Sequence, residues 1–186
     1  MKTLFCILGR SACGKDSLVN ALCNNTDAKK VISYTTRAKR IGETNTHIFS
    51  TKDVFDKHQE EKSTVASTQI GDVYYWTTID QVLSCDFYII DPNGLKELKE
   101  KLTNLPIKIV SIYITAPDRE REKRNFLRDS SSQEAYMKRI AAEEQQFYIY
   151  EKEKTYDYCI HNVHYGGSLE QLQQIVAYEK EKNNAL

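Results

Sequence analysis

Short apolar runs alternate with segments of helical periodicity along this chain. Residues 3–8 form an apolar run that predicts a strand buried on both faces. Residues 16–24 place Leu18, Ala21 and Leu22 at helical spacing. The same patterns predict strands at 31–34, 87–90, 107–114 and 158–160, a hairpin at 64–78 turning near Gly71, and helices at 52–62, 95–102, 118–146 (broken around 129–132) and 169–182.

Buried strands that alternate with helices predict an α/β fold with a parallel sheet covered on both faces. The polar segment 33–82 and the highly charged segment 119–139 interrupt that rhythm, and both are expected to be insertions mounted on the core. The 186 residues then form one domain, with its core in 1–32, 83–118 and 140–186. The segment 148–158 is rich in Glu and Lys and is expected to be a solvated helix end.

A glycine-bounded loop follows the first predicted strand and fits the pattern G-x-x-x-x-G-K. Its glycines let backbone N–H groups point inward around a phosphate, and the N-terminus of the following helix adds favourable partial charge. On a parallel sheet this loop predicts a three-layer P-loop fold. A ligand-free glycine-rich turn is the alternative. The candidate ATP-binding residues here are Gly9, Arg10, Ser11, Ala12, Cys13, Gly14, Lys15, Asp16 and Ser17, of which Lys15 is placed to reach the β- and γ-phosphates.

Asp16 stands where the usual pattern has Ser or Thr in contact with Mg²⁺. A carboxylate is a good hard-oxygen ligand for Mg²⁺, so Asp16 is a candidate to hold the ion directly or through water. Alternatively, Asp16 is only an acidic residue in the first turn of a helix, where the helix dipole favours negative charge.

Two arginine clusters complete the candidate chemistry. Arg37 and Arg40 lie three residues apart among hydroxyl side chains, a combination that suits a dianionic phosphate. Arg124 and Arg128 lie four residues apart and share a helix face. Each cluster alone is also typical of a solvated charged surface. Together with the phosphate loop they supply what phosphoryl transfer requires, namely positioning and charge stabilisation.

Composition excludes several classes of protein. Lys and Arg total 26 and Asp and Glu total 26, so zero net charge supplies no whole-chain attraction to nucleic acid or to an anionic membrane. Mean hydropathy is −0.58, and no apolar run approaches the roughly 20 residues needed to span a bilayer. Five cysteines without metal-ligand spacing are expected to be reduced thiols in a cytoplasmic protein.

Five motifs are similar to those of the guanylate kinase family of nucleoside monophosphate kinases, and the resemblance spans nearly the whole chain. They are GRSACGKDS at 9–17, SYTTRAKRIGE at 33–43, VYYWTT at 73–78, the lid arginines Arg124, Arg128 and Arg139, and YDYCIHN at 156–162. The acceptor signature at 33–43 is long and specific. The resemblance implies a P-loop fold with an acceptor-binding subdomain at 33–82 and a helical lid at 119–139.

The resemblance also implies roles for individual residues. The implied catalytic residues, on the ATP phosphates and the transition state, are Lys15, Arg124, Arg128 and Arg139. The implied acceptor-binding residues are Ser33, Arg37, Arg40, His47, Tyr75, Thr77 and Asp91, with Thr77 near the base and His47 where the family has a tyrosine. Asn162 would line the adenine pocket. The implied reaction is transfer of the γ-phosphoryl of MgATP to GMP or dGMP, with small nucleotides as partners of a monomer or homodimer.

Three departures bear on the acceptor base. His47 stands where the family has a tyrosine, and the family's guanine-reading Glu has no acidic counterpart in residues 64–69. Trp76 replaces a small glycine and is expected to reshape that wall. A kinase of the same fold for ribose 1,5-bisphosphate shows similarity in residues 14–17 and 45–48, so that acceptor stays open, as does another nucleoside monophosphate. A non-catalytic binding module is a further alternative, although such a module need not keep Lys15 and the lid arginines together.

Overall fold

The computed structural model describes residues 1–39, 43, 46–128 and 133–184. Its central sheet has four parallel strands in the order β6-β1-β7-β8. These strands are β1 (Lys2–Leu8), β6 (Phe87–Ile89), β7 (Ile107–Thr115) and β8 (Tyr158–His161). The predicted α/β class with a parallel sheet is therefore confirmed.

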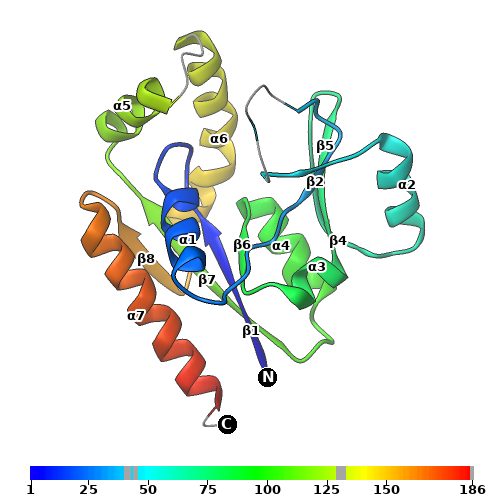
Figure 1. The fold of residues 1–186 in the computed structure, drawn as a ribbon. Coiled ribbons are helices and arrows are strands. Elements are labelled where there is room, and N and C mark those ends of the chain that lie inside the picture. Colours follow the sequence, from blue (N-terminus) through cyan, green and yellow to red (C-terminus); the bar gives the residue numbers. More distant parts are fainter. Residues whose placement is uncertain (40–42, 44–45, 129–132, 185–186) are drawn as a thin grey trace.

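Helices cover both faces of this sheet (Figure 1). On one face lie α1 (Lys15–Asn24) and α7 (Tyr165–Asn184), and on the other lie α3 (Ile79–Ser84), α4 (Pro92–Lys101) and α6 (Gln133–Glu153). Helix α5 (Asp118–Arg128) follows β7 along the chain and precedes α6. Within the described residues no helix is both long and apolar enough to cross a membrane.

Strand β1 shows why the apolar runs fold as they do. Leu4, Cys6 and Leu8 point into the core beneath α4 and α6, whereas Phe5 and Ile7 point into the core beneath α1 and α7. All five side chains are completely buried. Successive residues of a strand face opposite sides, so a strand between two helical layers must be apolar at every position.

A second, smaller sheet is built from residues between α1 and β6. Its strand order is β3-β2-β5-β4, formed by β2 (Tyr34–Thr35), β3 (Ile48–Phe49), β4 (Thr64–Ile70) and β5 (Val73–Thr78), and α2 (Lys52–Glu60) packs beside it. Trp76 is 1% exposed, stacks on Tyr34 at 5.1 Å between ring centroids, and donates its indole N–H to His58 Nδ1 at 2.9 Å. The indole thus forms the core of this sheet and also lines a cavity beside it.

Most predicted elements are present, and the differences have local causes. The predicted strand at 31–34 is wrong: Val31 is buried and bonds to Phe87, but the chain then leaves the central sheet, and pairing resumes at Tyr34 in the second sheet. The hairpin of β4 and β5 turns at Gly71, whose φ of +60° suits glycine. The predicted break at 129–132 lies outside the described residues.

Helix α3 was not predicted, although its N-terminus carries a recognisable signal. Thr78 and Gln81 form a capping box, in which Gln81 Oε1 accepts a hydrogen bond from the Thr78 backbone N–H at 3.0 Å. The helix is only six residues long, too short for periodicity to reveal it.

Replacement of Ile112 by Ala tests the central core. Ile112 in β7 is completely buried, so we expect the Ile112→Ala variant to lose about 2–5 kcal/mol in the free energy of unfolding. Urea denaturation measures the loss. The control is Ile149→Ala, because Ile149 is 58% exposed and its truncation should change stability by less than about 0.5 kcal/mol. Equal losses in the two variants would contradict this assignment of the core.

Candidate active site

The loop between β1 and α1 passes very close to the rest of the backbone. Gly9 has φ of +150°, and a Cβ there would lie 2.2 Å from the carbonyl oxygen of Ile114. Gly14 has φ of +98°, and a Cβ there would lie 2.2 Å from Asn162 Nδ2. Both glycines of the G-x-x-x-x-G pattern are therefore required by packing as well as by backbone conformation.

Side chains from distant parts of the chain converge on this loop. Lys15 Nζ donates to the carbonyl oxygens of Gly9 at 2.5 Å and Arg10 at 3.1 Å, which folds the ammonium group over the loop. The Cys13 carbonyl accepts from Asn162 Nδ2 at 2.8 Å and from Arg124 Nη1 at 3.3 Å. Arg124 Nη2 also donates to the Asn162 carbonyl at 2.8 Å. The structure thus brings Lys15, Arg124 and Asn162 together.

A cavity of about 490 Å³ opens on the outer side of the loop. Its lining residues are Ser11, Ala12, Gly14, Lys15, Asp16, Ser17, Arg124, Asn125 and Leu127. Asp16 contributes a carboxylate that is 62% exposed and lies 3.8 Å from Lys30 Nζ. An exposed carboxylate at the rim of a cavity lined by loop backbone is accessible to a hydrated cation, so the site fits Mg²⁺.

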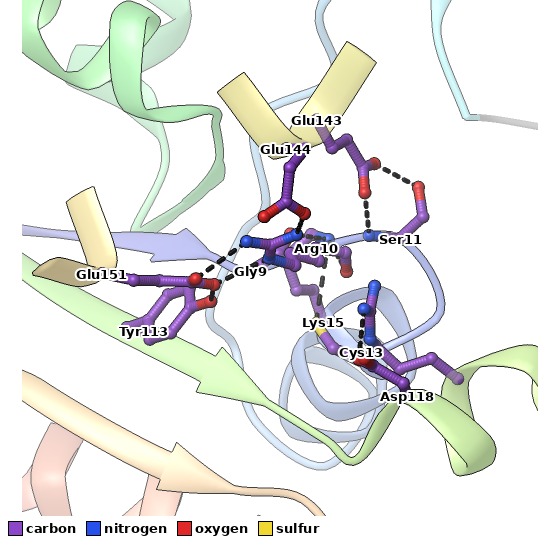
Figure 2. A network of polar contacts seen from close by, with 11 residues as sticks. Gly9, Arg10, Ser11, Cys13, Lys15, Tyr113, Asp118, Glu143, Glu144 and Glu151 are labelled. Atoms are coloured by element: carbon purple, nitrogen blue, oxygen red, sulfur yellow. Dashed lines mark hydrogen bonds and ion pairs between the residues drawn. The ribbon is translucent and has the colours of Figure 1, made fainter. Parts of the chain in front are cut away.

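Arg10 directs its guanidinium to α6. Its Nε and Nη2 donate to the two carboxylate oxygens of Glu151 at 2.7 and 2.8 Å, and its Nη1 donates to Glu144 (Figure 2). Tyr113 in β7 donates its hydroxyl to Glu151 as well. The Glu151 hydrogen bonds raise the pKa of Arg10. Burial alone would raise the pKa of Glu151, but the hydrogen bonds from Arg10 and Tyr113 outweigh it and lower that pKa.

Glu143 makes a separate contact with the loop. Its Oε2 accepts a hydrogen bond from the Ser11 backbone N–H at 2.8 Å, and its Oε1 accepts one from the Ser11 hydroxyl. The expectation that residues 148–158 form a solvated helix end is wrong in part, since Tyr150 is 7% exposed and Glu151 holds Arg10. The sequence carried a signal for this face: Glu143, Phe147 and Glu151 are spaced four residues apart, and Phe147 is buried.

A second cavity, of about 430 Å³, lies between the phosphate loop and the second sheet. Its lining includes Gly9 and Lys15 from the loop side, Ser33, His47, Ser67, Thr68, Tyr75 and Asp91 from the sheet side, and Glu143 from α6. Six of the sequence-predicted residues, namely Gly9, Lys15, Ser33, His47, Tyr75 and Asp91, are therefore gathered around one cavity.

Arg37 is held by a neighbouring carboxylate. Its Nη2 and Nη1 donate to the two oxygens of Glu43 at 2.7 and 3.0 Å, and its guanidinium carbon lies 5.5 Å from the centre of the Phe49 ring. These hydrogen bonds raise the pKa of Arg37. Two guanidinium nitrogens of Arg37 thus bind the two oxygens of one carboxylate, and a phosphate would bind to Arg37 in the same geometry.

The other residues predicted to bind the acceptor are held by hydrogen bonds or by ring packing. Thr77, completely buried, donates its hydroxyl to Ser33 Oγ at 3.0 Å. Asp91 caps α4 by accepting from the Gly94 N–H at 2.8 Å, and its second oxygen accepts from the Thr68 hydroxyl at 3.0 Å. His47 packs edge-on against Tyr75, with its Nδ1 buried and without a partner among the described residues. Burial and the Arg37 charge lower the pKa of His47.

Residues 64–69, which lack the family's base-reading Glu, lie in strand β4. Gln69 Nε2 donates to the Gly71 carbonyl at 2.8 Å, so its amide is engaged in the hairpin turn. The Ser67 N–H donates to Glu97 in α4 at 2.7 Å, a carboxylate that the sequence had not pointed to. Arg40 lies outside the described residues. Arg128 lies on α5 and Arg139 on α6, and for these two residues only the backbone is described.

This is a P-loop protein of the phosphotransferase class. It has a parallel sheet, a glycine-rich loop whose carbonyls bind the Lys15 ammonium group, and two cavities that Lys15 lines. The chain belongs to the guanylate kinase family, because the family model described as Guanylate kinase matches residues 1–179.

Curated relatives carry the same name. The guanylate kinase of Haemophilus ducreyi is 29% identical over 98% of this chain and 91% of the relative, and that of Pseudoalteromonas translucida is 31% identical over 95% and 87%. Among solved structures, the guanylate kinase of Anaplasma phagocytophilum matches with a TM-score of 0.67 at 19% identity, covering 96% of this chain and 86% of that one. This last likeness supports the fold alone.

Replacement of Arg10 tests the link between the loop and α6. We expect Arg10→Met to lower the free energy of unfolding by about 2 kcal/mol near neutral pH, because the part-buried Glu151 loses its charged partner. The pKa of Glu151 is lowered in the folded state, so this stabilisation is present above the ordinary carboxyl range and is lost as pH falls through the lowered value.

Urea titrations between about pH 7 and about pH 3 measure the difference from the wild type, which should shrink toward the acid end. Arg119→Met is the control, because Arg119 is exposed on α5. A difference that stays constant with pH would contradict the role given to Glu151.

Proposed function

We propose that this protein transfers the γ-phosphoryl group of ATP to the phosphate of GMP or dGMP. The observation that carries the proposal is the position of Lys15, which lines both the cavity outside the loop and the cavity facing Ser33, Tyr75 and Asp91. A donor phosphate held by the loop and an acceptor phosphate in the second cavity would then meet at one ammonium group. Family membership and the names of the curated relatives support the same reaction.

On the donor side, the loop backbone would cradle the ATP phosphates while Lys15 leaves its carbonyl contacts to reach them. Arg124 is already anchored at the loop through Cys13 and Asn162, so it requires little reorganisation to stabilise charge on the transferring group. Asn162 is 2% exposed and donates to the Cys13 carbonyl of the loop, and in this proposal it would line the adenine pocket. The proposal adds Arg128 and Arg139 from the lid, residues 119–139.

On the acceptor side, residues 33–82 would form the acceptor-binding subdomain. The acceptor phosphate would replace the Glu43 carboxylate on Arg37, with Arg40, Ser33, His47 and Tyr75 completing its contacts. Asp91 lines the same cavity and would contact the acceptor, and Thr77, completely buried and bonded to Ser33, would lie behind the base. No general base is needed, because the attacking atom is already an anionic phosphate oxygen, and positioning with charge stabilisation supplies the rate.

Asp16 would hold Mg²⁺ at the rim of the donor cavity, where its carboxylate is accessible. Bound Mg²⁺ would neutralise charge on the ATP phosphates during transfer. The proposal also covers location and partners. The enzyme would act in the cytoplasm on small nucleotides, with neither a nucleic acid nor a membrane partner. All five cysteines are free thiols, which suits a reducing compartment.

A second candidate keeps the fold and changes the acceptor. Residues 64–69 contain no carboxylate, and the hydroxyl of Thr68 is already bonded to Asp91. A site without the usual guanine-reading Glu is compatible with ribose 1,5-bisphosphate or with another nucleoside monophosphate.

An acceptor panel tests the proposal. MgATP-dependent ADP formation is measured with GMP, dGMP, AMP, CMP, UMP, dTMP and ribose 1,5-bisphosphate. We expect GMP or dGMP to exceed the others by about a hundredfold in kcat/KM, equivalent to about 2.7 kcal/mol of transition-state discrimination.

The Lys15→Ala variant should lose about a hundredfold or more in kcat, whereas Lys152→Ala, at an exposed position of α6, should retain wild-type turnover. Preference for ribose 1,5-bisphosphate or another base would favour the second candidate. ATP binding with no turnover of any acceptor would indicate a binding module.

The Asp16→Asn variant tests the metal site. We expect the Mg²⁺ concentration for half-maximal activity to rise by about tenfold, because an amide oxygen is a weaker ligand than a carboxylate. The measurement is a Mg²⁺ titration at fixed free ATP, with Asp80→Asn in the first turn of α3 as a matched control. An unchanged titration would instead support a role in starting α1.

A further inference from the structure

Glu143 occupies donor groups of the phosphate loop with its own carboxylate. It accepts from the Ser11 N–H at 2.8 Å and from the Ser11 hydroxyl, so both of its oxygens are bonded to one residue of the loop. Figure 2 shows these contacts reaching from α6 to the loop, beside the separate Arg10 network. Glu143 also lines the cavity that contains Gly9 and Lys15.

A carboxylate in this position resembles a phosphate in the properties that the loop recognises. Backbone N–H groups ahead of a helix N-terminus bind anions in general, whether carboxylate or phosphate. The Ser11 N–H cannot be fully available to a phosphate oxygen while it bonds to Glu143. Two anions in adjacent positions would also repel each other. Glu143 and a nucleotide phosphate therefore compete for Ser11.

The neighbouring Arg10 contact is of a different kind. The Arg10 side chain is 13% exposed and bonds to Glu151 through two nitrogens, and Tyr113 bonds to the same carboxylate. Separating this pair would leave a mostly buried charge without a partner, which is strongly unfavourable. Release of Glu143 only returns a carboxylate to an open cavity. Arg10 thus keeps the loop attached to α6, while Glu143 can be exchanged.

We propose that Glu143 is an intramolecular competitor of the ATP phosphates: it holds Ser11 in the nucleotide-free protein and is displaced when ATP binds. The inference rests on the proposed function for the identity of the nucleotide. Arg10 stays bonded to Glu144 and Glu151, so displacement of Glu143 frees the Ser11 donors without detaching α6 from the loop. The apparent affinity for ATP is reduced by the fraction of molecules in which Ser11 is free.

Calorimetric titration with MgATP, without an acceptor, tests the competition. If Glu143 holds Ser11 in nine molecules of ten, its removal strengthens apparent ATP affinity about tenfold. We expect this gain for Glu143→Gln, which loses the charge, and also for Glu143→Asp, which keeps the charge but is one methylene too short for the same contact. The control Glu153→Gln makes the same charge change at an exposed position of α6 and should stay within about twofold of wild type.

A second measurement follows the contact itself. The amide proton resonance of Ser11 in the nucleotide-free protein should move upfield in both Glu143 variants and stay in place in Glu153→Gln. Wild-type affinity in Glu143→Asp together with tighter binding in Glu143→Gln would assign the effect to charge at a distance and overturn the proposal. Unchanged affinity in both variants would overturn it too.

The outcome is separable from that of the proposed function. Wild-type turnover of GMP with unchanged affinity in the Glu143 variants rejects the competitor and leaves the kinase assignment standing. Tighter ATP binding in these variants without turnover of any acceptor supports the competitor and rejects the kinase assignment.

Discussion

The close approach of the phosphate loop to the strand ends is the constraint on which the rest of the site depends. At Gly9 the loop backbone has no room for a Cβ against Ile114, and at Gly14 it has none against Asn162. The loop is thereby fixed directly on the carboxyl ends of β1 and β7. Because α1, α5 and the β8–α7 connection start at that same edge, Lys15, Arg124 and Asn162 reach one point without long excursions of the chain.

Charge at the site is balanced by the chain itself. Arg10 is neutralised by Glu144 and Glu151, Arg37 by Glu43, and the Ser11 donors by Glu143. A concentrated set of anion-binding groups would be costly if left without partners. Local pairing thus places carboxylates at positions around the two cavities where substrate phosphates are proposed to bind.

The sequence predicted the features whose physics is local. The phosphate loop needs particular glycines at particular positions, and buried parallel strands need apolar residues throughout, so both were readable. The partners of the loop on α6 were not, because Ser11 and Glu143 are 132 residues apart. The four-residue spacing of Glu143, Phe147 and Glu151 marks one face of a helix, but it does not say that this face meets the loop. The false strand at 31–34 has the same origin: burial of Val31 is visible in the sequence, but departure from the sheet is not.

The packing of Trp76 gives the molecule a built-in optical probe. It is the single tryptophan of the chain, it is buried in the smaller sheet, and its indole N–H is bonded to the imidazole of His58 rather than to water. Fluorescence excited selectively in the indole therefore comes from the smaller sheet. Changes in that emission report rearrangement around β5 and α2, and the central sheet with its phosphate loop contributes no indole signal of its own.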